Sequence, residues 1–243
     1  MPASLTTVAL SSLVPVATAA AGATYAAFRP PSAKLRSAIQ HFAAGVVFSV
    51  VAVELLPDVV RVHDPLEIGL SFAAGLALML LLERFAKRSE AKQASGTEGL
   101  AGGATGQIVA IGIDIFIDGL LVGIAFAAGG REGILLTIAL SVELLSLGLA
   151  LASTLTGAGR ARTILIPTGL ALLLVVGAVA GDTVLRGASE HTLAGVLSFG
   201  SAALLYLVTE ELLVEAHEVT ETTFATTMFF AGFLLLLLLG MAG

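Results

Sequence analysis

Ile113-Asp114-Ile115-Phe116-Ile117-Asp118-Gly119 lies inside an apolar segment that runs roughly from residue 107 to residue 128. Asp114 and Asp118 are four residues apart, so on a helix they share one face about one turn apart. A third lone acid, Glu143, lies in the middle of the next apolar segment, residues 135–155, and neither segment contains a lysine or arginine. Charge inside a membrane is costly, and intramembrane ionisable groups usually face a cavity and have a function. Unpaired acids at these positions point to a cation as the missing partner.

The composition places the chain among polytopic membrane proteins. Of its 243 residues, 57% are hydrophobic and only 12% are charged, and its mean hydropathy is +1.00, which ordinary soluble domains do not reach. The net charge of −6 comes from 18 acids against 12 bases. The bases lie outside the predicted spans or, as with Arg84, at the very end of one, whereas several acids lie well inside them. Cysteine is absent, which excludes disulfides, thiolate metal sites and cysteine nucleophiles.

Eight apolar segments are long enough to cross about 30 Å of hydrocarbon as helices of roughly 20 residues. They are predicted at about residues 4–28, 37–60, 65–86, 106–128, 133–156, 163–184, 190–213 and 222–242. The first is interpreted as a retained helix and not as a signal peptide, because a charged leading region is missing and the apolar run continues to Phe28. The predicted fold class is therefore all-α, with eight transmembrane helices in one domain, residues 1–243.

The lysines and arginines predict the orientation of these helices. Nine of the 12 lie in or beside the first, third and fifth connections, and the positive-inside rule places those connections in the cytoplasm. Both termini are then extracytoplasmic, which fits an even number of spans. The third connection, about residues 87–105, is long and ends in a glycine-rich stretch, so we expect a flexible cytoplasmic loop there.

A repeated pattern links the second and seventh segments. Phe42-Ala43-Ala44-Gly45 leads through an apolar run to Glu54-Leu55-Leu56-Pro57-Asp58, and Phe199-Gly200-Ser201-Ala202 leads with the same spacing to Glu211-Leu212-Leu213-Val214-Glu215. In the predicted topology these two helices run in opposite directions. We therefore expect segments one to three and six to eight to be inverted repeats around segments four and five, an arrangement common in transporters with midplane sites.

Further acids gather toward the ends of the same two segments. Glu54 and Asp58 lie toward the outer end of the second span and are interpreted as an entrance. The inner end of the seventh span is interpreted as an exit and carries Glu210, Glu211, Glu215, His217 and Glu218. An acidic entrance, centre and exit suit a route for cations. The alternative for the end groups is that they are interfacial acids in contact with headgroup water.

The central acids define the chemistry of the ligand. Carboxylates are hard oxygen ligands that Mg²⁺, Ca²⁺ and Mn²⁺ favour, and zinc and ferrous iron also accept them. Ser141 and Ser146 are possible additional ligands in the same segment as Glu143. Carboxylates bind metal only when they are deprotonated, so metal entry should compete with protonation.

The same residues resemble the ZIP (Zrt/Irt-like) family of divalent-metal transporters. Phe42-Ala43-Ala44-Gly45 with Glu54-Leu55-Leu56-Pro57-Asp58 is similar to the phrase of the family's second helix, which usually carries histidine where Glu54 stands. Asp114-Ile115-Phe116-Ile117-Asp118-Gly119 resembles the fourth-helix signature His-Asn-x-Pro-Glu-Gly, and Glu143-Leu144-Leu145-Ser146 falls at the corresponding motif of the fifth helix. The resemblance implies eight helices in a three-plus-two-plus-three arrangement with external termini, transport of divalent metals, and a homodimer.

The chain also departs from that family pattern. Asp114 replaces a histidine ligand, Ile115 an asparagine, Ile117 a proline, Asp118 a glutamate, and Ser146 the glutamate that bridges two metals in relatives. We therefore expect one metal held by Asp114, Asp118 and Glu143, with a weaker preference for zinc and a stronger one for harder ions such as manganese. The transported substrate is expected to be a divalent ion of zinc, manganese, iron or cadmium, with no organic cofactor and no nucleic-acid partner. The expected location is the bacterial or archaeal plasma membrane.

Other classes use some of the same features. An intramembrane aspartyl hydrolase needs two opposed carboxylates, whereas Asp114 and Asp118 lie on one helix, and no other catalytic constellation is present, so an enzyme is not expected. A proton-coupled transporter of an organic cation stays open, although such a site is normally lined by aromatics and the chain has no tryptophan and two tyrosines. A ZIP-like scaffold that has lost transport also stays open.

Several smaller features carry predictions of their own. Gly119 and Gly123 are spaced for close packing between helices. His63 lies beside Asp64 in a predicted outer loop, where the pair is a candidate for attracting cations. The polar groups near span ends, His41, His191 and Asp182, are interpreted as solvated, capping or interfacial.

Overall fold

The computed structural model describes residues 3–94, 100–155, 159–217 and 222–242, and every regular element in these ranges is helical. In chain order the elements are α1 Leu5–Phe28, α2 Ala33–Val50, η1 Val51–Leu55, α3 Leu56–Arg61, α4 Pro65–Ala94, α5 Leu100–Ala128, α6 Gly130–Thr154, α7 Arg160–Leu185, α8 Glu190–Tyr206, η2 Leu207–Leu212, α9 Leu213–Ala216 and α10 Thr223–Ala242. Because α2, η1 and α3 follow one another without a break, as do α8, η2 and α9, the elements form eight long continuous helices, called rods below.

All eight rods are long and apolar enough to cross a membrane. Their bounds as candidate spans lie within four residues of the predicted ones, so the sequence located every span. The expected loop at 87–105 is different, because α4 continues to Ala94 and α5 begins at Leu100. Residues 87–94 consist, apart from one serine, of lysine, arginine, alanine, glutamate and glutamine, which favour helix. The remaining part of that expected loop, residues 95–99, lies outside the described residues.

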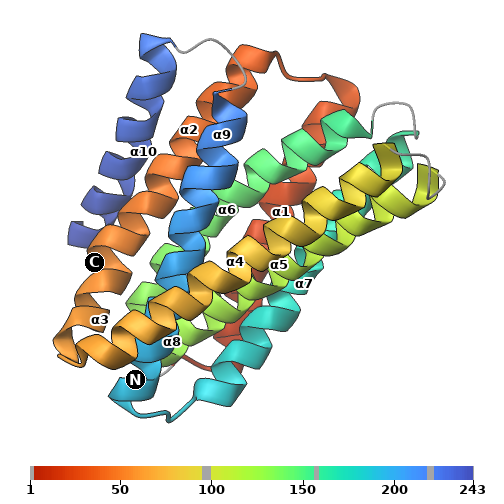
Figure 1. The fold of residues 1–243 in the computed structure, drawn as a ribbon. Coiled ribbons are helices and arrows are strands. Elements are labelled where there is room, and N and C mark those ends of the chain that lie inside the picture. The colour runs from red at the N-terminus through yellow and green to blue at the C-terminus, as the bar shows by residue number, and fades with distance from the viewer. Residues whose placement is uncertain (1–2, 95–99, 156–158, 218–221, 243) are drawn as a thin grey trace.

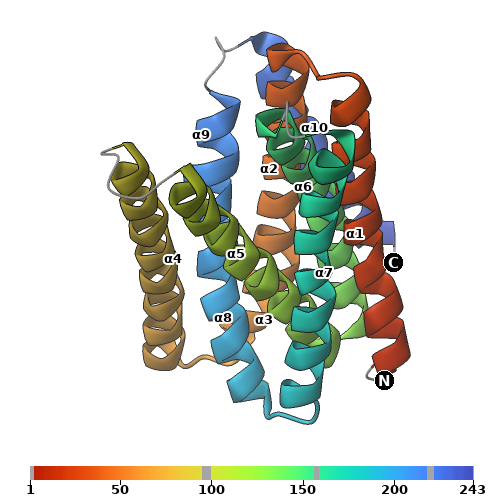
Figure 2. The ribbon, with the colours of Figure 1, turned by 90° about the vertical axis from the view of Figure 1, so that its right-hand side faces the viewer.

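The helices pack in neighbouring pairs around a core that runs through the whole bundle (Figure 1). α5 runs along α7, α1 contacts both α6 and α7, α2 runs along α10, and α4 along α8. Figure 2 shows α4 at one edge beside α8, with α1 at the opposite edge. The start of α1 and the end of α10 lie toward the end of the bundle that also carries the short connections at 62–64 and 186–189.

Glycines allow these pairs to approach closely. A side chain at Gly119 or Gly123 would collide with backbone carbonyls of α7, at Leu174 and Ala178 respectively. The close packing predicted for this pair is therefore confirmed. The same device occurs between α1 and α6, where Gly148 faces the carbonyl of Ala19. Small residues of this kind let helix backbones come into close contact. Such packing favours association in lipid, where the hydrophobic effect does not drive helices together.

The second and seventh rods each contain a short π-helical segment. η1 holds Glu54, and η2 holds Glu210 and Glu211. Such segments are rare, and they occur frequently at functional sites because the extra residue in the turn redirects side chains. Glu54 and Glu211 are the equivalent acids of the repeated sequence pattern, so the two copies share this irregular backbone as well as their residues.

Candidate metal centre

The three central acids lie together between α5 and α6. Asp114, Asp118 and Glu143 each offer one carboxylate oxygen, and these three oxygens lie within 4.8 Å of one another. Asp118 is 3% exposed and Glu143 is 4% exposed, whereas Asp114 is partly buried. The two acids that α5 contributes share a helix face, as their four-residue spacing requires. The structure therefore brings together all three residues that the sequence predicted as metal ligands.

Oxygens in this cluster lack partners within the described part of the protein. Asp118 Oδ2 and Glu143 Oε2 are buried and accept no hydrogen bond. Buried charges in proteins are normally paired or coordinate a metal, because an isolated ion loses its hydration without compensation. Neutralisation by a proton or by a cation would satisfy these oxygens. Three convergent carboxylate oxygens suit a divalent cation.

The residues that follow the acids in sequence are deeply buried. Ile115 and Leu144, which follow Asp114 and Glu143 in sequence, are 1% and 0% exposed. Gly119, one residue beyond Asp118, lies against the backbone of α7 and so draws α5 close to that helix. Asp118 and Glu143 are themselves almost inaccessible to water, and the partial exposure of Asp114 gives the cluster an opening.

The two serines of α6, which are candidates for additional ligands, differ in their position relative to the cluster. Ser141 donates its hydroxyl hydrogen to the carbonyl of Thr137 over 2.6 Å, and its position two residues before Glu143 places it on a different helix face. The structure thus gives no support for Ser141 as a ligand. Ser146 is buried, at 2% exposure, and lies three residues after Glu143, on the same side of the helix. It stays a prediction.

An acidic cavity leads to Asp114 from one end of the bundle. Its volume is about 260 Å³, and α4, α5, α6, η2 and α9 contribute to its wall. The acids that line it are Glu83, Asp114, Glu210, Glu211 and Glu215. The cavity thus joins the predicted exit residues Glu210, Glu211 and Glu215 to the central cluster. Glu211 is close enough to interact electrostatically with all three central acids.

Two further groups at this end differ from expectation. Glu83 was not among the candidate residues, although its place near the C-terminal end of the third apolar segment is a signal that the sequence contains. His217 does not line the cavity, and its ring lies edge-on to the ring of His41 with centroids 5.2 Å apart. His41 itself is 4% exposed, so its interpretation as a solvated or capping group is wrong. Glu218 lies outside the described residues.

The predicted entrance is a mixed-charge site. Glu54 is 8% exposed and its Oε1 lies 3.5 Å from Arg131, and Asp58 forms an ion pair of 2.7 Å with Arg61. Both acids line a cavity of about 530 Å³ whose wall also contains these arginines. None of the central acids is among its lining residues. Sequence reasoning missed the pairing of Glu54 with Arg131, because the two residues are far apart along the chain.

Asp182 also departs from expectation. It is fully buried and forms an ion pair with Arg186, the residue that caps the C-terminus of α7 one turn later. Its interpretation as a simple interfacial acid is therefore wrong. Unlike the central acids, it has a base within reach on its own helix, which makes it a useful reference for them.

Together, the eight long apolar helices indicate an integral membrane protein, and a cluster of three acids lies inside the bundle. No protein-family model matches the chain, and a search of curated proteins finds no significant match. The assignment of a function therefore rests on the residues and geometry of the site.

Proposed function

We propose that this protein transports divalent metal cations across the membrane, with Asp114, Asp118 and Glu143 as the ligands of the transported ion. The observation that carries the proposal is the convergence of three carboxylate oxygens within 4.8 Å, two of them on acids that are almost fully buried and keep an oxygen without a partner. Unpaired intramembrane acids are expensive and are retained for function. A purely structural bundle does not need them.

The acidic cavity supports a transport route. It connects one end of the bundle to Asp114 through Glu83, Glu210, Glu211 and Glu215, so a cation can exchange with water on that side. The cavity at Glu54 and Asp58 does not reach the central acids. In the proposed topology the open side is the cytoplasm, and the conformation is therefore inward-open. Alternating access then requires that the outer side opens while the inner cavity closes.

Helix packing supports an inverted repeat of three helices around a central pair. Gly75 of α4 faces the carbonyl of Phe199 on α8, and Gly232 of α10 faces the carbonyl of Phe42 on α2. Phe42 and Phe199 are equivalent in the repeated sequence pattern. The separation between Gly75 and Gly232 along the chain equals the separation between Phe42 and Phe199. The contact therefore recurs between the second and eighth spans and between the seventh and third. The π-helical segments at Glu54 and Glu211 fit the same correspondence.

The ligand set favours a hard or borderline ion. Three carboxylates and no nitrogen or sulfur ligand suit manganese, and zinc, ferrous iron and cadmium remain possible substrates. The resemblance to the ZIP family fits such a transporter, and in the proposed arrangement both termini face outward from the plasma membrane. The cluster contains three acids, and Ser146 offers no charge, so we propose one metal per site.

Uptake into proteoliposomes tests the proposal. The purified protein is reconstituted and the uptake of Mn²⁺, Zn²⁺, Fe²⁺, Cd²⁺ and Mg²⁺ is compared with that of Asp114→Asn, Asp118→Asn and Glu143→Gln, which keep side-chain size but remove the charge. We expect each variant to reduce uptake to background. Glu190→Gln removes a surface acid and serves as the charge-matched control, which should transport normally. Absence of metal flux in the folded wild type contradicts the proposal and redirects the search to protons or organic cations.

A further inference from the structure

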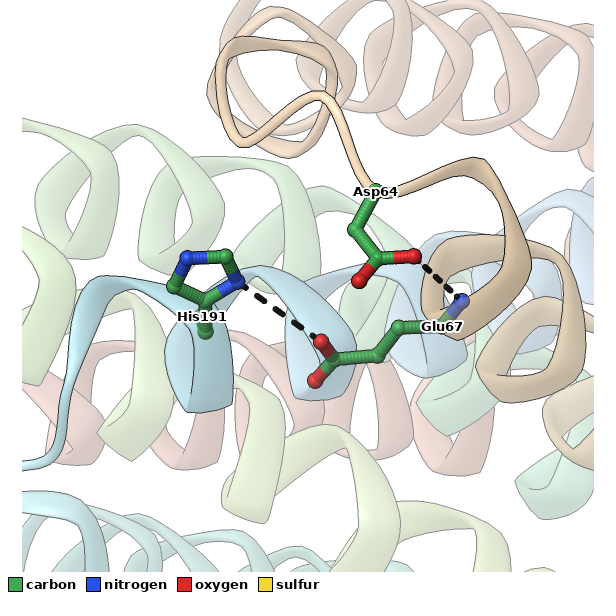
Figure 3. A group of neighbouring side chains, drawn as sticks. All are labelled: Asp64, Glu67 and His191. Carbon is green, nitrogen blue, oxygen red and sulfur yellow. Dashed lines mark hydrogen bonds and ion pairs between the residues drawn. The ribbon is translucent and has the colours of Figure 1, made fainter.

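A second group of metal-ligating side chains lies at the opposite end of the bundle from the acidic cavity. Asp64 precedes α4, Glu67 is in the first turn of α4, and His191 is in the first turn of α8. One ligand atom from each lies within 4.8 Å of the others. Figure 3 shows the three side chains turned toward one common space between the two helices. These residues are separate from the central acids and from the two cavities described above.

Local contacts hold this group in place. Asp64 Oδ1 accepts a hydrogen bond of 3.1 Å from the backbone N–H of Glu67, which leaves its other oxygen for a different partner (Figure 3). Ser198 Oγ donates to the carbonyl of Ile68 over 2.9 Å, which fixes α8 against α4 two turns from His191. Gly195 lies beside the carboxylate of Glu67, and the missing side chain leaves that carboxylate room. The position of the ligands is thus set by the helix pair.

The distances suit a bound ion better than a direct contact. His191 Nδ1 lies 3.7 Å from Glu67 Oε2, which is longer than a hydrogen bond. Ligand atoms about 2.1 Å from a tetrahedral zinc ion lie about 3.4 Å from one another. The observed separation is therefore close to what an ion between the two groups requires.

Helix capping explains only part of the arrangement. An acid before a helix and another in its first turn are favourable, because they satisfy free N–H groups and complement the helix dipole. The cap uses one oxygen of Asp64 and the backbone of Glu67. Capping does not account for the approach of the Glu67 carboxylate to an imidazole on another helix.

We infer that Asp64, Glu67 and His191 form a second divalent-metal site, which binds a first-row transition ion such as Zn²⁺. Imidazole nitrogen and carboxylate oxygen are both zinc ligands, and three protein ligands leave the fourth tetrahedral position for water. The nitrogen ligand makes this site softer than the all-carboxylate centre. A metal held there links the start of α4 to the start of α8, and α8 leads directly into the π-helical segment with Glu211. The site binds metal whether or not the protein transports it.

Calorimetric titration with Zn²⁺ tests the inference on the full-length protein in detergent. The central acids are first removed as Asp114→Asn, Asp118→Asn and Glu143→Gln together, so that any remaining saturable binding belongs elsewhere. We expect one zinc equivalent to remain, and His191→Asn or Glu67→Gln to weaken it at least about tenfold, the lower bound for the loss even of an outer partner of a metal ligand. Glu67→Gln preserves the backbone N–H that Asp64 caps.

His63→Asn is the matched control, because His63 is an exposed histidine in the same connection and is not part of the group. Its φ of 55° is a conformation that asparagine tolerates. If the triple background does not fold, the same pair of histidine variants is compared in the wild-type protein, where His191→Asn should remove one zinc equivalent and His63→Asn none. Equal zinc binding in the two histidine variants overturns the inference and leaves the proposed transport site untouched.

Discussion

Asp114 on α5 and Glu143 on α6 each lie five residues before a glycine that packs against a backbone carbonyl of a neighbouring helix. Gly119 follows Asp114 and faces α7, and Gly148 follows Glu143 and faces α1. Each neighbouring helix also packs a glycine of its own against the helix that carries the acid. Gly177 of α7 faces the carbonyl two residues after Asp114, and Gly22 of α1 faces the carbonyl two residues after Glu143.

These reciprocal contacts give the two acids equivalent positions in two similar helix pairs. In the proposed inverted repeat, the approximate two-fold axis then passes between α5 and α6, and the acids meet across it. Asp118 has no equivalent acid, because the corresponding position on α6 is Leu147. The cluster is therefore asymmetric, with two acids from α5 and one from α6.

Asp118→Asn should show separately how much the buried carboxylate destabilises the protein and whether it binds metal. In metal-free detergent solution we expect the melting temperature of this variant to equal or exceed that of the wild type, because an unpartnered buried acid becomes neutral. The wild type should gain about 2.7 kcal/mol at a metal concentration 100 times the dissociation constant, and the variant should not. Thermal melts with and without Mn²⁺ measure both effects.

Asp182→Asn is the reference for that measurement. Asp182 is equally buried but is paired with Arg186, whose side chain is 37% exposed. Neutralisation of Asp182 should lower the melting temperature, because the charge-assisted contact with Arg186 is lost. Its response to metal should resemble that of the wild type. If both variants lose stability to the same extent, Asp118 is a structural acid and not a ligand.

The packing of α5 on α7 gives a prediction about stability. Gly177→Ala places a Cβ against the carbonyl of Phe116, whereas Gly169 on the same helix has open space around it. We expect Gly177→Ala to destabilise the protein by about 1–3 kcal/mol through overpacking. Gly169→Ala should be neutral or stabilising, because alanine favours helix by about 1 kcal/mol. Equal melting temperatures for the two variants would show that α5 and α7 separate at little cost.

The sequence predicted the spans and the central cluster because both depend on strong local signals. Long apolar runs fix the helices, and acids without local bases stand out within them. Asp114, Asp118 and Glu143 were therefore found from spacing and composition alone. The end of α4 was not predicted correctly. Residues 87–94 are polar enough to suggest a loop, but their helix propensity favours continuation of the helix.

Interactions between distant segments explain the other differences. Glu54 pairs with Arg131, and His41 is buried beside His217, and neither contact follows from neighbouring residues. The link between Glu67 and His191 likewise depends on the packing of α4 against α8. Periodicity and composition give the position of a residue along its helix, but the partner that it meets is decided by the fold.

Glu211→Gln should weaken metal binding at the centre, although Glu211 is not one of the three proposed ligands. Its charge interacts with the central acids, so its loss lowers the local attraction for a cation. We expect a higher apparent KM for uptake, with an effect that shrinks as ionic strength rises. Glu210→Gln, in the same cavity and the same π-helical segment, is the matched control and should change KM less. A larger effect at Glu210 would contradict the proposed route.

Asp114→His should change which metal is preferred. The substitution introduces one imidazole nitrogen among the carboxylates, and nitrogen ligands favour zinc over manganese. In a competition assay with both ions, we expect the ratio of Zn²⁺ to Mn²⁺ uptake to rise relative to the wild type. Asp114→Asn supplies the control for loss of charge and should abolish uptake of both. An unchanged ratio would mean that Asp114 does not contact the ion.

Metal binding at the centre should release protons and weaken as the pH falls. Carboxylates coordinate a metal only when deprotonated, so the metal-free cluster holds at least as many protons as the bound one. The apparent dissociation constant should therefore increase on acidification, by about tenfold per pH unit for each proton displaced. Calorimetry in two buffers of different ionisation enthalpy counts those protons directly. The His191→Asn background removes the contribution expected from the second site, and metal binding that is independent of pH in this background contradicts the assignment of the three acids as ligands.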